Sequence, residues 1–360
     1  MAASPYASSL GRLKAEGTSL LPGEGYLPFL NATTVDEFLK ALGATAHAAE
    51  LERARAAYAG VPLAEATLNR TLVARNRHAY EATPFAGRLT VAAYLRRWDV
   101  ENIAAILASK VQRQALSVGE TELVSSREIP AGLIAGPMTI DDVRALLALP
   151  GVDAIAAELV RYGYGGALLP RIEEFQRTRD IFPLLQALQA QYYAAVLETT
   201  RFFQGDEWTV RDLLRGEIDA RNVLLLFKGK DAGLPFEEVG ARWIPGGAIG
   251  NAEAADLYGA RDVPELAERL APRYPGLAEG SEAYAESGAL SSYDLLLQRG
   301  RLAAELRRLG SYPMGLAGIF SYLLLAEAER NDLRRLLFAV VYAVPVERRR
   351  RLLVGPRAVG

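Results

Sequence analysis

The sequence contains no cysteine and only two histidines, His47 and His78. Without cysteine there can be no disulfide, no thiolate zinc site and no cysteine nucleophile. Two histidines are too few for a multi-histidine metal centre, and we expect both at ordinary surface or half-buried positions. These absences remove the residue types on which many catalytic and metal sites depend.

Long hydrophobic runs and an excess of one charge are also missing. The longest apolar stretches, 315–326 and 336–346, have about a dozen residues, whereas a membrane span needs roughly 18 or more. The first residues lack a charged segment followed by an apolar one, so no secretory signal is expected. A net charge of −2 gives no bulk attraction to nucleic acid. We therefore expect a cytoplasmic protein without a nucleic-acid partner.

Long segments rich in Ala, Leu, Glu and Arg predict an all-α fold, and almost nothing alternates with the period of a strand. Capping boxes are expected at Thr34, Thr139 and Thr209, each with an acid three residues later. Pro183 should kink or split one long helix. Only 127–133 and 242–249 read as short extended loops. The predicted helices span 5–19, 35–51, 63–82, 88–116, 140–149, 152–161, 171–204, 210–229, 253–258, 264–271, 281–308, 315–343 and 346–353.

A short polar pattern recurs three times. An acid is followed three residues later by Asn or Asp and then at once by an apolar stripe. The acids lie 120 and 110 residues apart, which suits three related helical modules near 1–125, 126–240 and 241–360. The aligned pairs are Asp99 with Asn102, Asp219 with Asn222, and Glu329 with Asp332.

Two further landmarks keep the same register. Pro235 and Pro345 each lie 13 residues after the second polar residue of their copy. An Ile-Pro-x-Gly loop follows in the first copy (Pro130, Gly132) and in the second (Pro245, Gly246, Gly247), whereas the third copy is expected to end before reaching it.

A motif used three times usually solves a structural problem common to three modules, whereas an active site needs one asymmetric set of roles. Residues three apart share a helix face, so each pair can accept backbone amides from a neighbouring loop or helix start. We also expect Glu217–Arg221 and Arg97–Glu101 to pair along their helices. The segment 162–166, Tyr-Gly-Tyr-Gly-Gly, is expected to be a flexible linker, and 348–351 a solvated basic helix end.

The order of these motifs resembles the C subunit of archaeal-type and bacterial V/A-type ATPases, which is homologous to the d subunit of eukaryotic V-ATPase. The third copy is the most diagnostic, with Tyr312-Pro313-Met314-Gly315 followed by Glu327, Glu329 and Asp332. It departs from the usual pattern in having Asp332 where Asn is common. The resemblance covers most of the chain and is weaker at 52–86 and 250–292.

The resemblance implies three similar helical domains with pseudo-threefold symmetry, arranged like a funnel, and a non-catalytic role without a cofactor. Such a protein lies on the cytoplasmic face of the membrane, where it joins the D and F subunits of the central stalk to the proteolipid ring. It transmits torque between ATP hydrolysis or synthesis and ion transport. The a/I subunit of the membrane stator is a further candidate partner. The repeated acids would be structural or stalk-facing, and the Pro-x-Gly loops would face the ring.

Two other classes remain open at this point. A free-standing helical-repeat scaffold would reuse the same architecture to bind other proteins. An all-α enzyme that uses aspartates with Mg²⁺ would need clustered acids, but the single Asp-Asp pair, Asp141-Asp142, has no third acid in register.

Overall fold

The structure is a computed structural model that describes residues 6–17, 19–112, 138–204 and 207–356. These residues form helices joined by short turns, with no strand among them, which confirms the all-α prediction. The loop at 242–249 has turns and bends on either side of Trp243 and Ile244, whereas 127–133 lies outside the described residues. Within these ranges no helix is both long and apolar enough to cross a bilayer.

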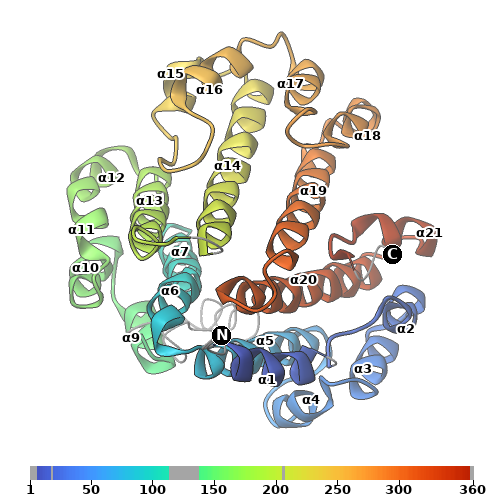
Figure 1. Cartoon of the computed structure of the whole chain (residues 1–360). Helices are drawn as coiled ribbons and strands as arrows, with labels where there is room; N and C mark the ends of the chain where they lie inside the picture. Colours follow the sequence, from blue (N-terminus) through green and yellow to red (C-terminus); the bar gives the residue numbers. More distant parts are fainter. Residues whose placement is uncertain (1–5, 18, 113–137, 205–206, 357–360) are drawn as a thin grey trace.

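The helices that Figure 1 draws from blue to teal cover the first third of the chain. They are α1 (Ala7–Gly17), the 3-10 helix η1 (Gly23–Tyr26), α2 (Leu27–Asn31), α3 (Val35–Gly43), α4 (Ala48–Ala54), α5 (Gly60–Ala82), α6 (Phe85–Leu95) and α7 (Arg97–Val111). One long helix was expected over 88–116. The chain instead turns at Arg96, so that α6 and α7 are separate.

A group of mostly short helices follows, at the left of Figure 1. It comprises α9 (Ile140–Ala148), α10 (Val152–Glu158), η4 (Leu159–Tyr162), α11 (Gly165–Leu168), η5 (Leu169–Arg171), α12 (Ile172–Thr178) and α13 (Phe182–Glu198). The predicted split of 171–204 is confirmed, because Pro183 lies in the first turn of α13.

The remaining helices form the top and right of Figure 1. They are α14 (Trp208–Asp231), α15 (Phe236–Gly240), α16 (Asn251–Tyr258), α17 (Val263–Leu270), η7 (Leu277–Glu279), α18 (Gly280–Ser287), α19 (Ser291–Gly310), α20 (Leu316–Val341), α21 (Val346–Arg349) and η8 (Arg350–Leu352). The predicted helix over 281–308 is broken at Gly288, whose φ of +65° is left-handed.

The predicted helix starts are only partly confirmed. Thr139 and Asp142 form the full capping box at α9. Thr34 accepts from the Glu37 amide, and the Glu37 carboxylate accepts from the amide of Thr33 at 2.7 Å. The prediction at Thr209 is wrong, since α14 begins one residue earlier and places Thr209 inside the helix.

The described residues form three hydrophobic cores. A central core joins α1, α6, α7, α9–α13 and the second halves of α5 and α19 to the first halves of α14 and α20. The second half of α14 packs with α15–α19 in another core. The second half of α20 packs against the segment from Leu21 to Leu68 in the third, so the two ends of the chain share a core. Each long helix therefore connects the centre of the molecule to a peripheral core (Figure 1).

α14 and α20 end in the same way, which explains the repeated prolines. A left-handed residue follows each helix closely, with a φ of +65° at Gly233 and +50° at Ala343. The next amide bonds back to the helix, from Leu234 to the Gly229 carbonyl at 2.9 Å and from Val344 to the Ala339 carbonyl at 2.8 Å. This is the Schellman arrangement, after which proline cannot continue the helix.

This pairing predicts opposite effects of two small substitutions. Ala343 is exposed and carries a Cβ in a conformation that suits glycine, so Ala343→Gly should raise the free energy of unfolding by about 1 kcal/mol. Gly233→Ala should lower it by a similar amount. Urea unfolding followed by circular dichroism measures both, and a loss of stability in Ala343→Gly would contradict the prediction.

Candidate functional site

Helices α7, α14 and α20 meet in a buried ion cluster. Arg97, Glu217 and Glu327 occupy the same position of the three sequence copies, two residues before the aligned acid. Arg97 Nη1 lies 3.3 Å from Glu217 Oε1 and 3.4 Å from Glu327 Oε2. One arginine thus joins two carboxylates from equivalent places on the other two helices.

Helix α19 adds a second arginine to this cluster. Arg301 bonds Glu305 at 2.7 Å and lies 3.8 Å from Glu217. We call Arg97, Glu217, Arg301, Glu305 and Glu327 the central ion cluster. The side chains of Glu217 and Glu305 are only 4% and 7% exposed, so water contributes little to their solvation.

The charges of the cluster oppose the effect of burial to different degrees. Burial alone would raise the pKa of Glu217, but the charges of Arg97, Arg301 and Arg221 hold that pKa below its ordinary value. At Glu305 burial dominates and raises the pKa to about 7. At Glu327 burial also raises the pKa, against the opposing charge of Arg97.

The contacts of the cluster hold helices together. Tyr94 accepts from Arg97 and donates to Glu217, so an aromatic hydroxyl closes one side. Among the described residues no group of three or more His, Cys, Asp or Glu could hold a metal ion. The helical pairing expected for Glu217 and Arg221 is replaced by a tertiary contact, in which Arg221 donates to the Tyr193 hydroxyl at 2.7 Å.

The second copy of the repeat holds the Pro-x-Gly loop through backbone bonds. Asn222 forms two bonds with Ile244, donating to its carbonyl at 2.8 Å and accepting its amide at 2.9 Å. Asp219 Oδ1 accepts the amides of Ala248 at 2.9 Å and Ile249 at 3.0 Å. Burial raises the pKa of Asp219, although these two amides favour the carboxylate.

The same contact explains why residue 247 is a glycine. A Cβ added there would lie 2.2 Å from Asp219 Oδ1, a distance that no side chain tolerates. Pro245 and Gly246 are exposed, whereas Gly247 is half-buried. Pro130 and Gly132, the corresponding residues of the first copy, lie outside the described residues.

The third copy reaches an equivalent loop, contrary to the expectation that it ends too early. Asp332 accepts the amides of Val354 at 2.8 Å and Gly355 at 2.7 Å. Val354 lies as far beyond Asp332 as Ile244 lies beyond Asn222. The sequence hid this match because the third copy has Val-Gly-Pro in place of Ile-Pro-Gly.

Glu329 has a different set of partners from Asp219, its aligned residue. It accepts the Leu21 amide at 2.6 Å and Arg75 Nη1 at 2.7 Å, and it contacts His47 Nε2 at 3.1 Å. All three partners belong to the first part of the chain. The expectation of a surface or half-buried histidine is therefore wrong for His47, which is fully buried, whereas His78 is half-buried as expected.

The first copy pairs with a segment that was expected to be a flexible linker. Tyr164 is 4% exposed, and its hydroxyl donates to Asp99 Oδ2 at 2.9 Å. Gly163 ends η4 with a φ of +83°, and α11 begins two residues later. The segment is an ordered helical connection, because both tyrosines pack and only glycine suits the left-handed turn. Asn102, the aligned partner of Asp99, is buried beside it in α7.

The basic run at 348–351 is also not wholly solvated. Arg349 is buried and donates to the carbonyls of Leu30, Ala32 and Val344. Its three neighbours are exposed. The guanidinium thus supplies donors to backbone carbonyls near the ends of α2 and α20. Arg349 is therefore a structural residue and not part of a solvated helix end.

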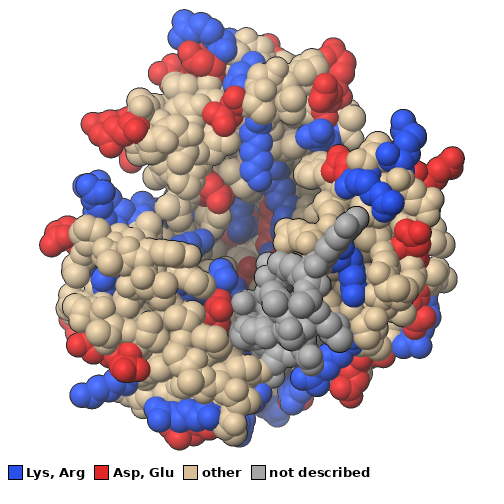
Figure 2. Space-filling view, turned by 180° about the vertical axis from the view of Figure 1, so that it is seen from behind, with Lys and Arg blue, Asp and Glu red and all other residues tan. Residues whose placement is uncertain are grey.

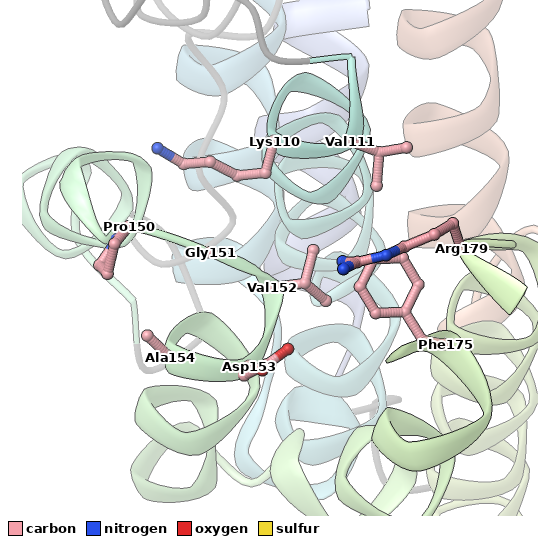
Figure 3. A pocket seen from close by; sticks show the side chains of 9 residues that line it. All are labelled: Lys110, Val111, Pro150, Gly151, Val152, Asp153, Ala154, Phe175 and Arg179. Atoms are coloured by element: carbon pink, nitrogen blue, oxygen red, sulfur yellow. The ribbon is translucent and has the colours of Figure 1, made fainter. Parts of the chain in front are cut away.

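A cavity of about 630 Å³ opens between the end of α7 and the start of α10 (Figure 3). Lys110, at the end of α7, and Arg179, which follows α12, both line it, and Asp153 lies on the α10 side. Asp153 accepts from Gln176 at 2.7 Å. The described residues that line it include no nucleophile with an adjacent base, and none of the repeated acids.

On the face opposite to that of Figure 1 the molecule is hollowed at its centre. Figure 2 shows acidic and basic side chains inside this hollow, with broad uncharged surfaces around it. A mixed-charge hollow of this kind suits a polar protein segment better than an apolar ligand, which would need an apolar lining.

Sequence reasoning finds the aligned acids but not the ion cluster. It predicts partners for Arg97 and Glu217 only along their own helices, and none for Glu327. The sequence signal for this cluster was that Arg97, Glu217 and Glu327 occupy the same position in the three copies. The aligned residues are one arginine and two glutamates. Side chains of opposite charge can pair when three copies bring the same position together, whereas three like charges would repel one another.

Comparison with known proteins places these features in one family. The family model described as ATP synthase (C/AC39) subunit matches residues 10–352. The C subunit of an A-type ATP synthase from Thermoplasma volcanium is 32% identical over 95% of this chain and 96% of its own length. The corresponding protein of Thermoplasma acidophilum is 30% identical over 98% of both, and that of Archaeoglobus fulgidus is 23% identical over 97% and 96%. The chain therefore belongs to the ATP synthase (C/AC39) subunit family.

Proposed function

We propose that this chain is a non-catalytic part of an A-type ATP synthase, in which it couples a D/F central stalk to the membrane proteolipid ring. The observation that carries the proposal is the family match over nearly the whole chain, with relatives of similar length that are named as C subunits of such synthases. In this role the chain would be peripheral on the cytoplasmic face of the membrane and would transmit torque.

The geometry supports a part that must stay rigid under load. Three long helices converge on one ion cluster, where their packing also forms the central core. Contacts between equivalent positions support a pseudo-threefold arrangement of three related units near 1–125, 126–240 and 241–360. The hollow of Figure 2 would receive the stalk.

Two surfaces compete for the contact with the ring. The first is formed by the Pro-x-Gly loops, of which Pro245 and Gly246 are exposed. Their sequence is, however, already accounted for by the bonds to Asp219 and Asn222. The second is a group of exposed apolar side chains at the starts of α6, α14 and α20.

Affinity capture tests the function directly. The full-length tagged chain, expressed in its own host and extracted with mild detergent, should retain D, F and the proteolipid in fixed stoichiometry. Recovery of unrelated proteins without these subunits would favour a free-standing helical scaffold instead. A preparation in which the chain is alone, while the rest of the synthase assembles without it, would contradict the proposal.

A further inference from the structure

Exposed apolar side chains gather where three helices begin. The start of α6 carries Phe85 and Leu89, 93% and 69% exposed. The turn before α14 and its first residue carry Phe202 and Trp208, 83% and 44% exposed. Tyr312 and Met314, 46% and 49% exposed, precede α20. We call these six residues the apolar rim. Apolar side chains are seldom left grouped in water unless a partner covers them.

The three helix starts lie next to one another. A Cβ added at Gly87 in α6 would lie 2.7 Å from Cδ1 of Leu316, the first residue of α20. Arg308, near the end of α19, pairs with Asp212 near the start of α14 at 3.6 Å. The starts of α14 and α20 and the end of α19 also come together near the centre of Figure 1. The six rim residues thus belong to helix starts that meet at a single junction.

The charges around the rim favour a protein partner over a bilayer. Arg201 and Arg211 stack on the rings of Phe202 and Trp208, at 5.5 Å and 5.0 Å. Acids lie among the arginines, since Glu198 pairs with Arg201 and Asp212 with Arg308. Anionic headgroups select surfaces with clustered positive charge. Arg88, between Phe85 and Leu89, donates to the Thr83 carbonyl and lies over the Tyr80 ring. These arginines are paired or stacked rather than gathered in one free basic cluster, which suits a protein surface.

We propose that the apolar rim is the surface by which this chain binds the proteolipid ring. The inference rests on the proposed function and assigns its membrane-side contact. A ring of identical subunits presents the same loop many times around one axis. A rim that repeats exposed apolar side chains at three helix starts around one junction can engage several such loops at once. A single stalk helix would need only one of them.

Three substitutions test the rim in the full-length chain. The variant Phe85→Ser, Trp208→Ser, Met314→Ser removes one exposed apolar side chain from each helix start. Tyr342→Ser is the matched control, because Tyr342 is 74% exposed but lies at the other end of α20, roughly 40 Å away along the helix. Pro245→Ser probes the competing loop. Affinities for the detergent-solubilised proteolipid ring and for the D/F stalk are measured separately by biolayer interferometry.

We expect the rim variant to bind the ring at least about 30-fold more weakly, which corresponds to losing one interface hot spot or more. Its affinity for D/F should be unchanged, and Tyr342→Ser should behave as wild type in both assays. If the triple variant melts early, Phe85→Ser alone decides the outcome, because that side chain is almost wholly exposed.

Several results would overturn the inference. Wild-type ring affinity in the rim variant would do so, as would a loss confined to Pro245→Ser. Binding of wild type but not of the rim variant to vesicles of phosphatidylglycerol would identify lipid as the occupant. If the wild-type chain binds neither ring nor D/F, the proposed function itself fails, which is a distinguishable result.

Discussion

Replacing Arg97 by methionine is expected to lower the free energy of unfolding by about 3–5 kcal/mol, the range found when one partner of a buried ion pair is removed. Methionine keeps much of the volume of the side chain but leaves the carboxylates of Glu217 and Glu327 without the charge that joins them. The loss should loosen α7, α14 and α20 at their meeting point.

The pH dependence separates this charge effect from simple loss of packing. Without Arg97, burial and the neighbouring carboxylates should raise the pKa of Glu217 above its unfolded value of 4.5. A carboxyl with a raised folded pKa costs nothing below the unfolded pKa and destabilises the fold increasingly as pH rises. The stability gap between wild type and Arg97→Met should therefore widen from about pH 5 to about pH 8.

Urea titrations at these two pH values measure the gap. The variant Arg97→Met, Glu217→Gln, Glu327→Gln is the matched control, and it should recover part of the lost stability, because the two carboxylates that Arg97 joined are then neutral. A gap that stays constant with pH, together with no recovery in the triple variant, would show that Arg97 acts through packing alone.

Glu329→Ala is also expected to lower the free energy of unfolding by about 3–5 kcal/mol, but for a different reason. Its carboxylate accepts from Arg75, which is 4% exposed, and from the Leu21 amide. Alanine leaves a buried guanidinium without this counterion and a backbone amide without an acceptor. The first part of the chain would lose its polar attachment to α20.

Amide hydrogen exchange gives the local measurement for this variant. Protection should fall most at Leu21 and in α3–α5, while the core between α14 and α19 keeps its protection. Glu50→Ala serves as control, because its partner Arg53 is 69% exposed and such surface pairs contribute little. Uniform loss of protection across the molecule would contradict a local role for Glu329.

The reach of sequence reasoning can be seen at particular elements. Pro183 and the capping box of Thr139 with Asp142 are predicted correctly, because proline and short polar caps act within one helical turn. The break at Arg96 is missed, since both sides of it are helical by composition and only packing fixes the change of direction. The break at Gly288 is also missed, although a glycine that adopts the left-handed conformation at a helix end is a local signal. Thr209 fails as a cap for a related reason, because α14 starts earlier than its local signal indicates.

The candidate site divides in the same way. The aligned acids could be found because spacing along one helix is a property of the sequence alone. The bond between Asp332 and Val354 and the burial of His47 beside Glu329 could not, since both join residues separated by a loop or by most of the chain.

By itself, the sequence determined the all-α class, the threefold recurrence of the acids and the likeness to its family, since all three depend on local composition and order. Only the tertiary structure decided which charges meet. Arg97, Glu217 and Glu327 pair because three helices, more than a hundred residues apart in sequence, bring equivalent positions together. A buried charge is stable only beside its opposite, so the identity of that neighbour is a property of the fold.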